Sequence, residues 1–179
     1  MRLAVVSIVI LAGAAGCGGD PEVNGSFGNT AVKLTHAYSR TPLPTDKSII
    51  VTILNREIDC EHPQNDALKN LSGLTLEVFV HGAGGDSVPA NGGTFQVVAA
   101  VDPANPQGND AVVGFSVNDA QCVAQLPVAA QSGRVTLEKL SPPSGSVDAL
   151  LPTGDHFSGD FAALKCDPPP GLGAGAACF

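Results

Sequence analysis

The sequence lacks residues on which several classes of protein depend. It has no tryptophan and one tyrosine, Tyr38, which disfavours a sugar-binding platform, since these usually expose aromatic rings. Nine basic residues against 17 acidic ones give a formal net charge of −8. Because such a chain repels phosphate backbones, we expect no nucleic-acid partner. The N-terminal apolar run, residues 3–15, has thirteen residues, fewer than the roughly 20 of a transmembrane helix.

Motifs of catalysis and metal binding are also missing. The sequence has no Cys-x-x-Cys and no Gly-x-Ser-x-Gly, so we expect neither a zinc ribbon nor a nucleophile elbow. In the segment 59–62 (Asp-Cys-Glu-His), strand alternation would place His62 opposite the two carboxylates, which is poor metal geometry. The oxygen-rich loop 102–110 lacks the EF-hand spacing. We therefore predict no enzymatic activity, no metal and no cofactor.

The N-terminus has the order of a secretory signal. Arg2 precedes the apolar run, and the small residues Ala14, Ala15 and Gly16 lead to Cys17. This tetrapeptide resembles the lipobox of bacterial lipoproteins, in which the cysteine thiol receives a diacylglycerol and the signal is then cleaved before the cysteine. The alternative is an ordinary signal peptide that carries a cysteine near its end. The resemblance implies residues 1–16 as signal peptide and Cys17 as the lipid attachment site.

Residues 17–29 are predicted to be a lipidated tether, because Gly and Pro interrupt any periodicity there. Acyl chains on Cys17 would make a membrane the one predicted partner, with any protein or glycan partner unknown. In enteric-type sorting, Asp after the lipidated cysteine retains a lipoprotein in the inner membrane. Gly18 occupies that position, which favours the outer membrane of a bacterial envelope.

The chain has five cysteines, an odd number for an exported protein. Lipidation of Cys17 would leave four, which suits disulfides in an oxidising compartment. We prefer to pair Cys60 with Cys166, because each ends a predicted strand, and Cys122 with Cys178. The alternative pairs Cys60 with Cys122 and Cys166 with Cys178.

Period-two alternation between turn residues dominates the rest of the chain. It predicts strands at 30–39, 48–54, 73–81, 94–101, 111–117, 121–126, 134–140, 146–151 and 156–166. Short strands without a sustained helical period indicate an all-β fold. We predict an antiparallel β-sandwich of about eight or nine strands over residues 30–166, with little or no helix. Residues 167–179, rich in Pro, Gly and Ala, are predicted to be a flexible tail.

The segment 132–166 has a recognisable pattern: Ser-Gly-x-Val-Thr-Leu, then Gly-Ser-Val, then Gly-Asp-His-x-Ser-Gly-x-Phe before Cys166. It resembles small exported lipoproteins of myxobacteria and related bacteria, and the likeness extends over about residues 28–166. This resemblance implies a fold and a location but no activity. We therefore expect a lipid-anchored, non-enzymatic envelope protein with a structural or recognition role. The alternatives are a carbohydrate- or adhesin-type binding module and an envelope enzyme.

Overall fold

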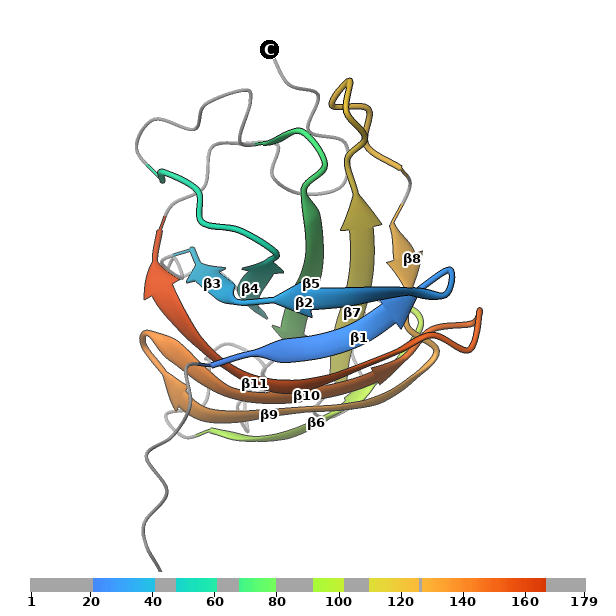
Figure 1. Cartoon of the computed structure of the whole chain (residues 1–179). Coiled ribbons are helices and arrows are strands. Elements are labelled where there is room, and N and C mark those ends of the chain that lie inside the picture. Colours follow the sequence, from blue (N-terminus) through green and yellow to red (C-terminus); the bar gives the residue numbers. More distant parts are fainter. Residues whose placement is uncertain are drawn as a thin grey trace, which may run out of the picture.

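The structure is a computed structural model that describes residues 21–40, 48–60, 68–79, 92–101, 110–125 and 127–166. Within these ranges it contains eleven strands and confirms the all-β prediction (Figure 1). In chain order they are β1 (Val23–Phe27), β2 (Thr30–Leu34), β3 (His36–Ser39), β4 (Ser48–Leu54), β5 (Ser72–Phe79), β6 (Gly93–Val97), β7 (Asp110–Val117), β8 (Val128–Ala129), β9 (Ser132–Leu140), β10 (Pro143–Leu150) and β11 (His156–Lys165).

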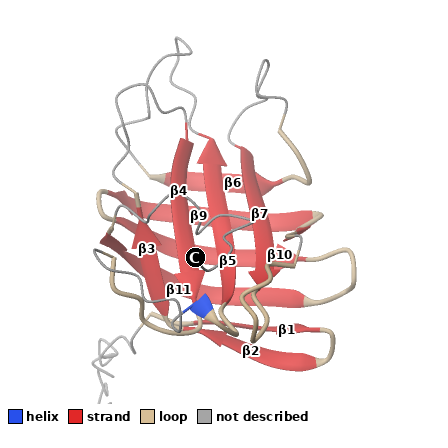
Figure 2. Cartoon of the chain, turned by 90° about the horizontal axis from the view of Figure 1, so that it is seen from above, coloured by secondary structure: helices blue, strands red, loops and turns tan. Residues whose placement is uncertain are grey.

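Eight of the strands form a closed ring in the order β10-β9-β6-β7-β5-β4-β3-β11, which closes because β11 also pairs with β10. The predicted antiparallel β-sandwich is therefore wrong, and the fold is an eight-stranded β-barrel. In Figure 2, β4, β5 and β7 cross over β6, β9, β10 and β11 at a steep angle, so the barrel wall has two facing sides, as a sandwich has two layers. Both arrangements need strands with one apolar face.

Two short parallel pairings join the two groups of strands that cross each other. Gln96 and Val97 of β6 pair with the start of β7, and residues 163–165 of β11 pair with residues 37–39 of β3. In a sandwich these strands would be edges with unpaired backbone groups, and closure of the barrel satisfies those groups. The partners lie far apart in the sequence, so local patterns could not reveal them.

Apolar side chains fill the barrel interior. The alternation predicted for β5 and β7 is confirmed, since Leu74, Leu76 and Val78 are buried, as are Ala111, Val113 and Phe115. The largest fully buried side chains of the core include Phe95, Phe115, Phe157, Leu34, Ile49, Ile53, Leu137 and Leu151. An eight-stranded barrel is just wide enough for side chains to fill it in this way.

The barrel domain begins earlier than the sequence suggested. Val23–Phe27, assigned to the tether (17–29), forms β1, which pairs with β2 and with β11. Gly28 and Asn29 have φ angles of 55° and 67°, as a two-residue type I′ hairpin turn requires. The ring of Phe27 then packs on Phe115 in the core. The chain before the barrel is thus shorter than predicted, ending at Glu22.

Several predicted strands differ in detail from the observed ones; the one predicted at 94–101, for example, ends at Val97 of β6. The strand predicted at 30–39 divides at Thr35 into β2 and β3, and the inward face changes there: Leu34 and Ala37 both join the main core. The strand predicted at 121–126 is replaced by an isolated bridge between Asn118 and Ala124. β2 belongs to a hairpin and β3 to the barrel wall, so the change of partner at Thr35 explains the change of face.

Candidate functional site

Several predicted site residues lie outside the described residues. They are Cys17, Cys178, His62 and the loop segment 102–109. Lipid attachment at Cys17 therefore stays a prediction, as does the flexible tail at 167–179. Of the residues that the structure describes, none form a group of three or more His, Cys, Asp or Glu side chains able to hold a metal ion.

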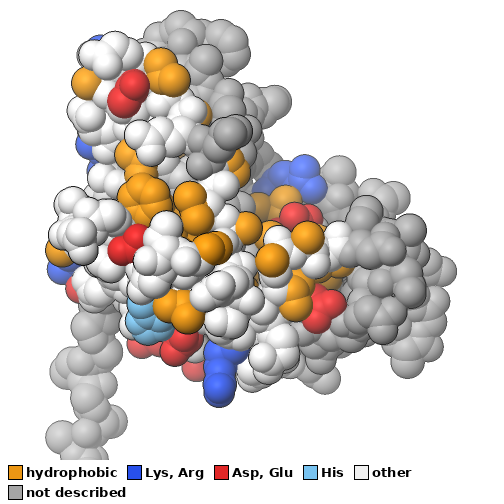
Figure 3. Space-filling view, turned by 90° about the vertical axis from the view of Figure 1, so that its right-hand side faces the viewer, with side chains coloured by type: hydrophobic (Ala, Val, Ile, Leu, Met, Phe, Trp, Pro, Cys, Tyr) orange, Lys and Arg blue, Asp and Glu red, His pale blue; other side chains and the backbone are white. Residues whose placement is uncertain are grey.

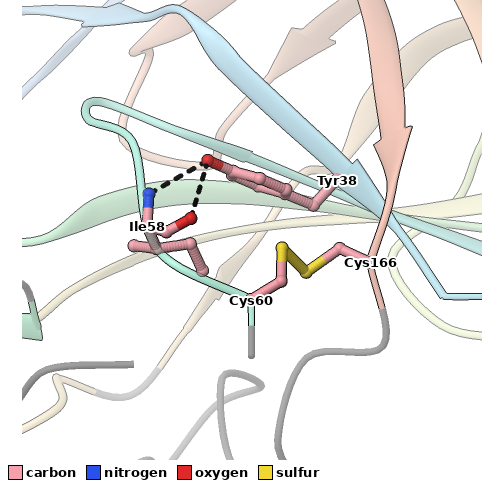
Figure 4. The surroundings of a disulfide bond; sticks show 4 residues. All are labelled: Tyr38, Ile58, Cys60 and Cys166. Atoms are coloured by element: carbon pink, nitrogen blue, oxygen red, sulfur yellow. Dashed lines mark hydrogen bonds between the residues drawn. A yellow bond between two sulfur atoms is a disulfide. The ribbon is translucent and has the colours of Figure 1, made fainter. Parts of the chain in front are cut away.

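The structure joins Cys60 to Cys166 in a disulfide, which is the preferred pairing (Figure 4). Cys60 follows β4 and Cys166 follows β11, and their Cα atoms are 5.7 Å apart, a separation typical of disulfides. The bond closes a sequence separation of 106 residues. Cys122 is also disulfide-bonded. Its predicted partner, Cys178, lies outside the described residues, so that pairing stays a prediction.

The Cys60–Cys166 bond lies in a second apolar cluster on the outer side of the barrel wall. Ala37 faces the main core, whereas its neighbour Tyr38 belongs to this second cluster. The Tyr38 hydroxyl accepts a hydrogen bond from the Ile58 N–H at 3.0 Å and donates one to the Ile58 carbonyl at 3.4 Å (Figure 4). Burial raises the pKa of Tyr38 above its usual value. These bonds fix the segment 55–60 against the barrel and so place Cys60 beside Cys166.

A single carboxylate connects the two turns at one end of the barrel. Asp155, in the β10–β11 connection, accepts hydrogen bonds from the Thr153 hydroxyl at 2.7 Å, the Gly28 N–H at 3.1 Å and the Ser26 hydroxyl at 3.0 Å. We call these four residues the Asp155 cluster. Hydrogen bonds from Thr153, Gly28 and Ser26 hold the pKa of Asp155 below its usual value. Sequence reasoning missed this role, because Asp155 looked like an ordinary turn residue.

A small pocket lies at the opposite end of the barrel. It has a volume of about 90 Å³ and is lined by Ser39, Arg40, Leu140, Ser141, Pro142, Pro143 and Lys165. These residues come from the ends of β3 and β11 and from the β9–β10 connection. Pockets for cofactors and drug-sized ligands measure about 300–1,000 Å³, so this one has room for only a few non-hydrogen atoms. Its walls are apolar apart from the two cationic side chains and two serines.

The described histidines lie away from this pocket. His156 is on the outer face of the barrel, with its Nε2 3.1 Å from the Asp148 carboxylate. Ser158, two residues along the same strand, is exposed on the same face. His36 Nδ1, at the start of β3, lies 2.9 Å from the Thr35 hydroxyl. His156 and Ser158 are therefore neighbours on an exposed surface of β11.

Comparison with family models, with curated proteins and with solved structures finds no match to this chain. Across the part of the chain that is described, no helix has the length and apolar character needed to cross a membrane.

Proposed function

We propose that this protein is a lipid-anchored, non-enzymatic β-barrel of the bacterial envelope, with a structural or recognition role. The observation that carries the proposal is the sequence Ala14-Ala15-Gly16-Cys17 after a charged and then apolar N-terminus. Small residues before a cysteine suit the narrow groove of a signal peptidase, and the thiol is the nucleophile that takes up lipid. Two or three acyl chains hold a protein durably at a bilayer, whereas one is marginal.

The cysteines and the packing of the barrel support the same reading. Cys60, Cys122 and Cys166 are all disulfide-bonded, which suits a compartment outside the cytoplasm. The interior of the barrel is occupied by its own phenylalanine and aliphatic side chains, as expected of a barrel that serves as a rigid scaffold. A scaffold of this kind offers its outer surface and its turns for recognition.

The anchoring is tested by replacing Cys17 with alanine in a bacterium fed labelled palmitate. Acylation precedes cleavage, so the variant should incorporate no label and keep its signal, migrating as the longer form. Ser7→Ala, in the same N-terminal segment, is the matched control and should be labelled and cleaved like the wild type. Equal labelling of the wild type and the Cys17 variant would overturn the anchoring at this residue.

The membrane in which the protein resides is tested separately. In an enteric host, Gly18→Asp should move the protein from the outer-membrane fraction to the inner-membrane fraction, while Gly19→Asp should leave it in place. If the wild type already fractionates with the inner membrane, the outer-membrane assignment is wrong, although the lipid anchor itself would stand.

A further inference from the structure

The lipid anchor would hold the barrel very close to the bilayer. Only five residues, 18–22, separate Cys17 from Val23, and Val23 is fully buried and paired with Gly159 of β11. An extended chain advances at most about 3.6 Å per residue, so six steps bring Val23 within about 20 Å of the lipidated residue. This distance is similar to the length of one barrel strand. The parts of the barrel near the start of β1 are therefore the ones that can reach the membrane.

The chain that leads into β1 approaches the barrel from one particular end. Figure 1 shows it at the left, together with the β9–β10 connection and the end of β11, whereas the β1–β2 turn and the β10–β11 connection lie at the right. From Gly159, the partner of Val23, β11 runs five residues to Leu164, which is about 16 Å. Leu164 therefore lies about 16 Å from the partner of Val23, in the direction from which the tether enters the barrel.

This end has the chemistry of a bilayer contact. We define the tether end as Lys139, Leu140, Pro142, Leu164 and Lys165. Leu164 is 65% exposed, one of two exposed large hydrophobic residues among those described, and both lysines are exposed. An exposed aliphatic side chain flanked by lysines suits the boundary between acyl chains and anionic headgroups.

Other faces are less suitable. The middle of the outer surface of β10 and β11 carries the exposed carboxylates Asp148 and Asp160, which an anionic bilayer repels. Asp160 shares the outward face of β11 with Leu164 but lies four residues, about 13 Å, from it along the strand. Hydrophobic side chains gather in places on the end opposite the tether as well, among acidic side chains (Figure 3). The chain before Val23 leads away from that end, since the Glu22 carbonyl accepts a hydrogen bond from the Asp160 N–H, one residue beyond Gly159 along β11. At the tether end, the exposed acid Glu138 adjoins Lys139, so the two lysines leave a net positive charge among these three residues.

We infer that the tether end docks on an anionic lipid surface, with Leu164 at the acyl boundary and Lys139 and Lys165 at the headgroups. The inference rests on the proposed lipid anchor at Cys17. Docking would fix the orientation of the barrel, so that the Asp155 cluster and the turns around it point away from the membrane. These turns would then be the surface presented to a partner.

The absence of tryptophan from the chain allows a direct test. Leu164→Trp and Val123→Trp each introduce one fluorophore at an exposed hydrophobic position; Val123, 61% exposed, follows β7 and is the matched control. The full-length lipidated variants are reconstituted in vesicles of phosphatidylethanolamine and phosphatidylglycerol, with or without brominated acyl chains. Bromine should quench the tryptophan at 164 several-fold more than the tryptophan at 123. Equal quenching at both positions, or none at 164, would overturn the docking.

A second pair of variants tests the charges. In the Leu164→Trp background, Lys139→Glu with Lys165→Glu should relieve the quenching, since each lysine near an anionic surface is expected to shift the docked population by about fivefold. Arg134→Glu, on the outer face of β9, changes the charge by as much as either lysine reversal alone; it is the control for each single reversal and should preserve the quenching. Quenching that survives the double reversal would contradict the role of the lysines. Flotation with the vesicles separates the two proposals: protein that fails to float lacks the anchor, whereas protein that floats without quenching at 164 has the anchor but does not dock.

Discussion

Replacing Phe115 by alanine would test the packing at the centre of the barrel. Phe115 lies on β7 and is 1% exposed. Its ring centroid is 4.8 Å from that of Phe27 on β1 and 4.7 Å from that of Phe157 on β11. The ring therefore connects three strands that are distant in the sequence, including the hairpin that sequence composition had assigned to the tether.

The expected loss is large. Truncation of a buried phenylalanine costs about 3–5 kcal/mol in the free energy of unfolding, and each aromatic pair adds about 0.5–1.5 kcal/mol beyond burial. The ring of hydrogen-bonded strands limits how far the wall can collapse into the cavity, so we expect the upper half of that range. Typical domains have a total stability of about 5–15 kcal/mol. At about 3–5 °C per kcal/mol for a domain of this size, the Tm should fall by roughly 12–25 °C.

Thermal and urea unfolding of the purified exported protein, followed by far-UV circular dichroism, measures this loss. Ser116→Ala, the next residue on the same strand, is the matched control and should change stability by less than about 0.5 kcal/mol. A double-mutant cycle of Phe27→Ala with Phe115→Ala should show coupling, because the two rings are in contact. Equal Tm losses for the Phe115 and Ser116 variants would refute the assignment of the inward face of β7.

Three further substitutions test other parts of the structure. Cys60→Ala should lower the Tm far more than Cys178→Ala, because opening a loop with a sequence separation of 106 costs up to about 4.7 kcal/mol in the chain-entropy model; similar losses for the two variants would contradict this. Gly159→Ala should destabilise the barrel by about 1–3 kcal/mol, since φ is +149° and a Cβ would collide with the Glu22 carbonyl oxygen, while Ser158→Ala, measured by the same urea titration, should stay near the wild type. Asp155→Asn should lower stability at neutral pH. Hydrogen bonds from Thr153, Gly28 and Ser26 hold the pKa of Asp155 below its usual value, so its contribution is full above the unfolded-state pKa and is lost as the pH falls through the folded-state pKa; a difference from wild type that does not shrink anywhere on acid titration would argue against the carboxylate as its source.

Local patterns were sufficient for most of the individual strands. Side chains on a strand alternate between two faces, so the buried set Leu74, Leu76 and Val78 could be read directly from the sequence, and so could that of β7. The Cys60–Cys166 bond was also anticipated, because both cysteines follow apolar strands. The Asp155 cluster could not be anticipated, because its members lie in two turns that only the folded barrel brings together.

At the N-terminus, composition is a poor guide to structure. Asn24, Gly25 and Ser26 are typical linker residues, yet they form the middle of β1. Gly25 lies against the Phe157 ring, where a Cβ would collide with that ring. The small residue that suggested a linker is thus one that allows the hairpin to approach β11 closely. The pocket and the exposed Leu164 were likewise invisible in the sequence, since both depend on the β9–β10 connection meeting the end of β11.

The sequence by itself determined the all-β class, the buried face of most strands and the candidate lipid site at Cys17. These are local properties: a period of two, a turn residue or a short motif contains the whole signal. Only the tertiary structure decided that the strands close into a barrel rather than stack as a sandwich, and which turns share an end with the start of β1. The backbone edges of all strands offer the same hydrogen-bonding groups. The choice of neighbour therefore depends on the packing of the whole core, as the parallel pairing of Ala163 with Ala37 illustrates.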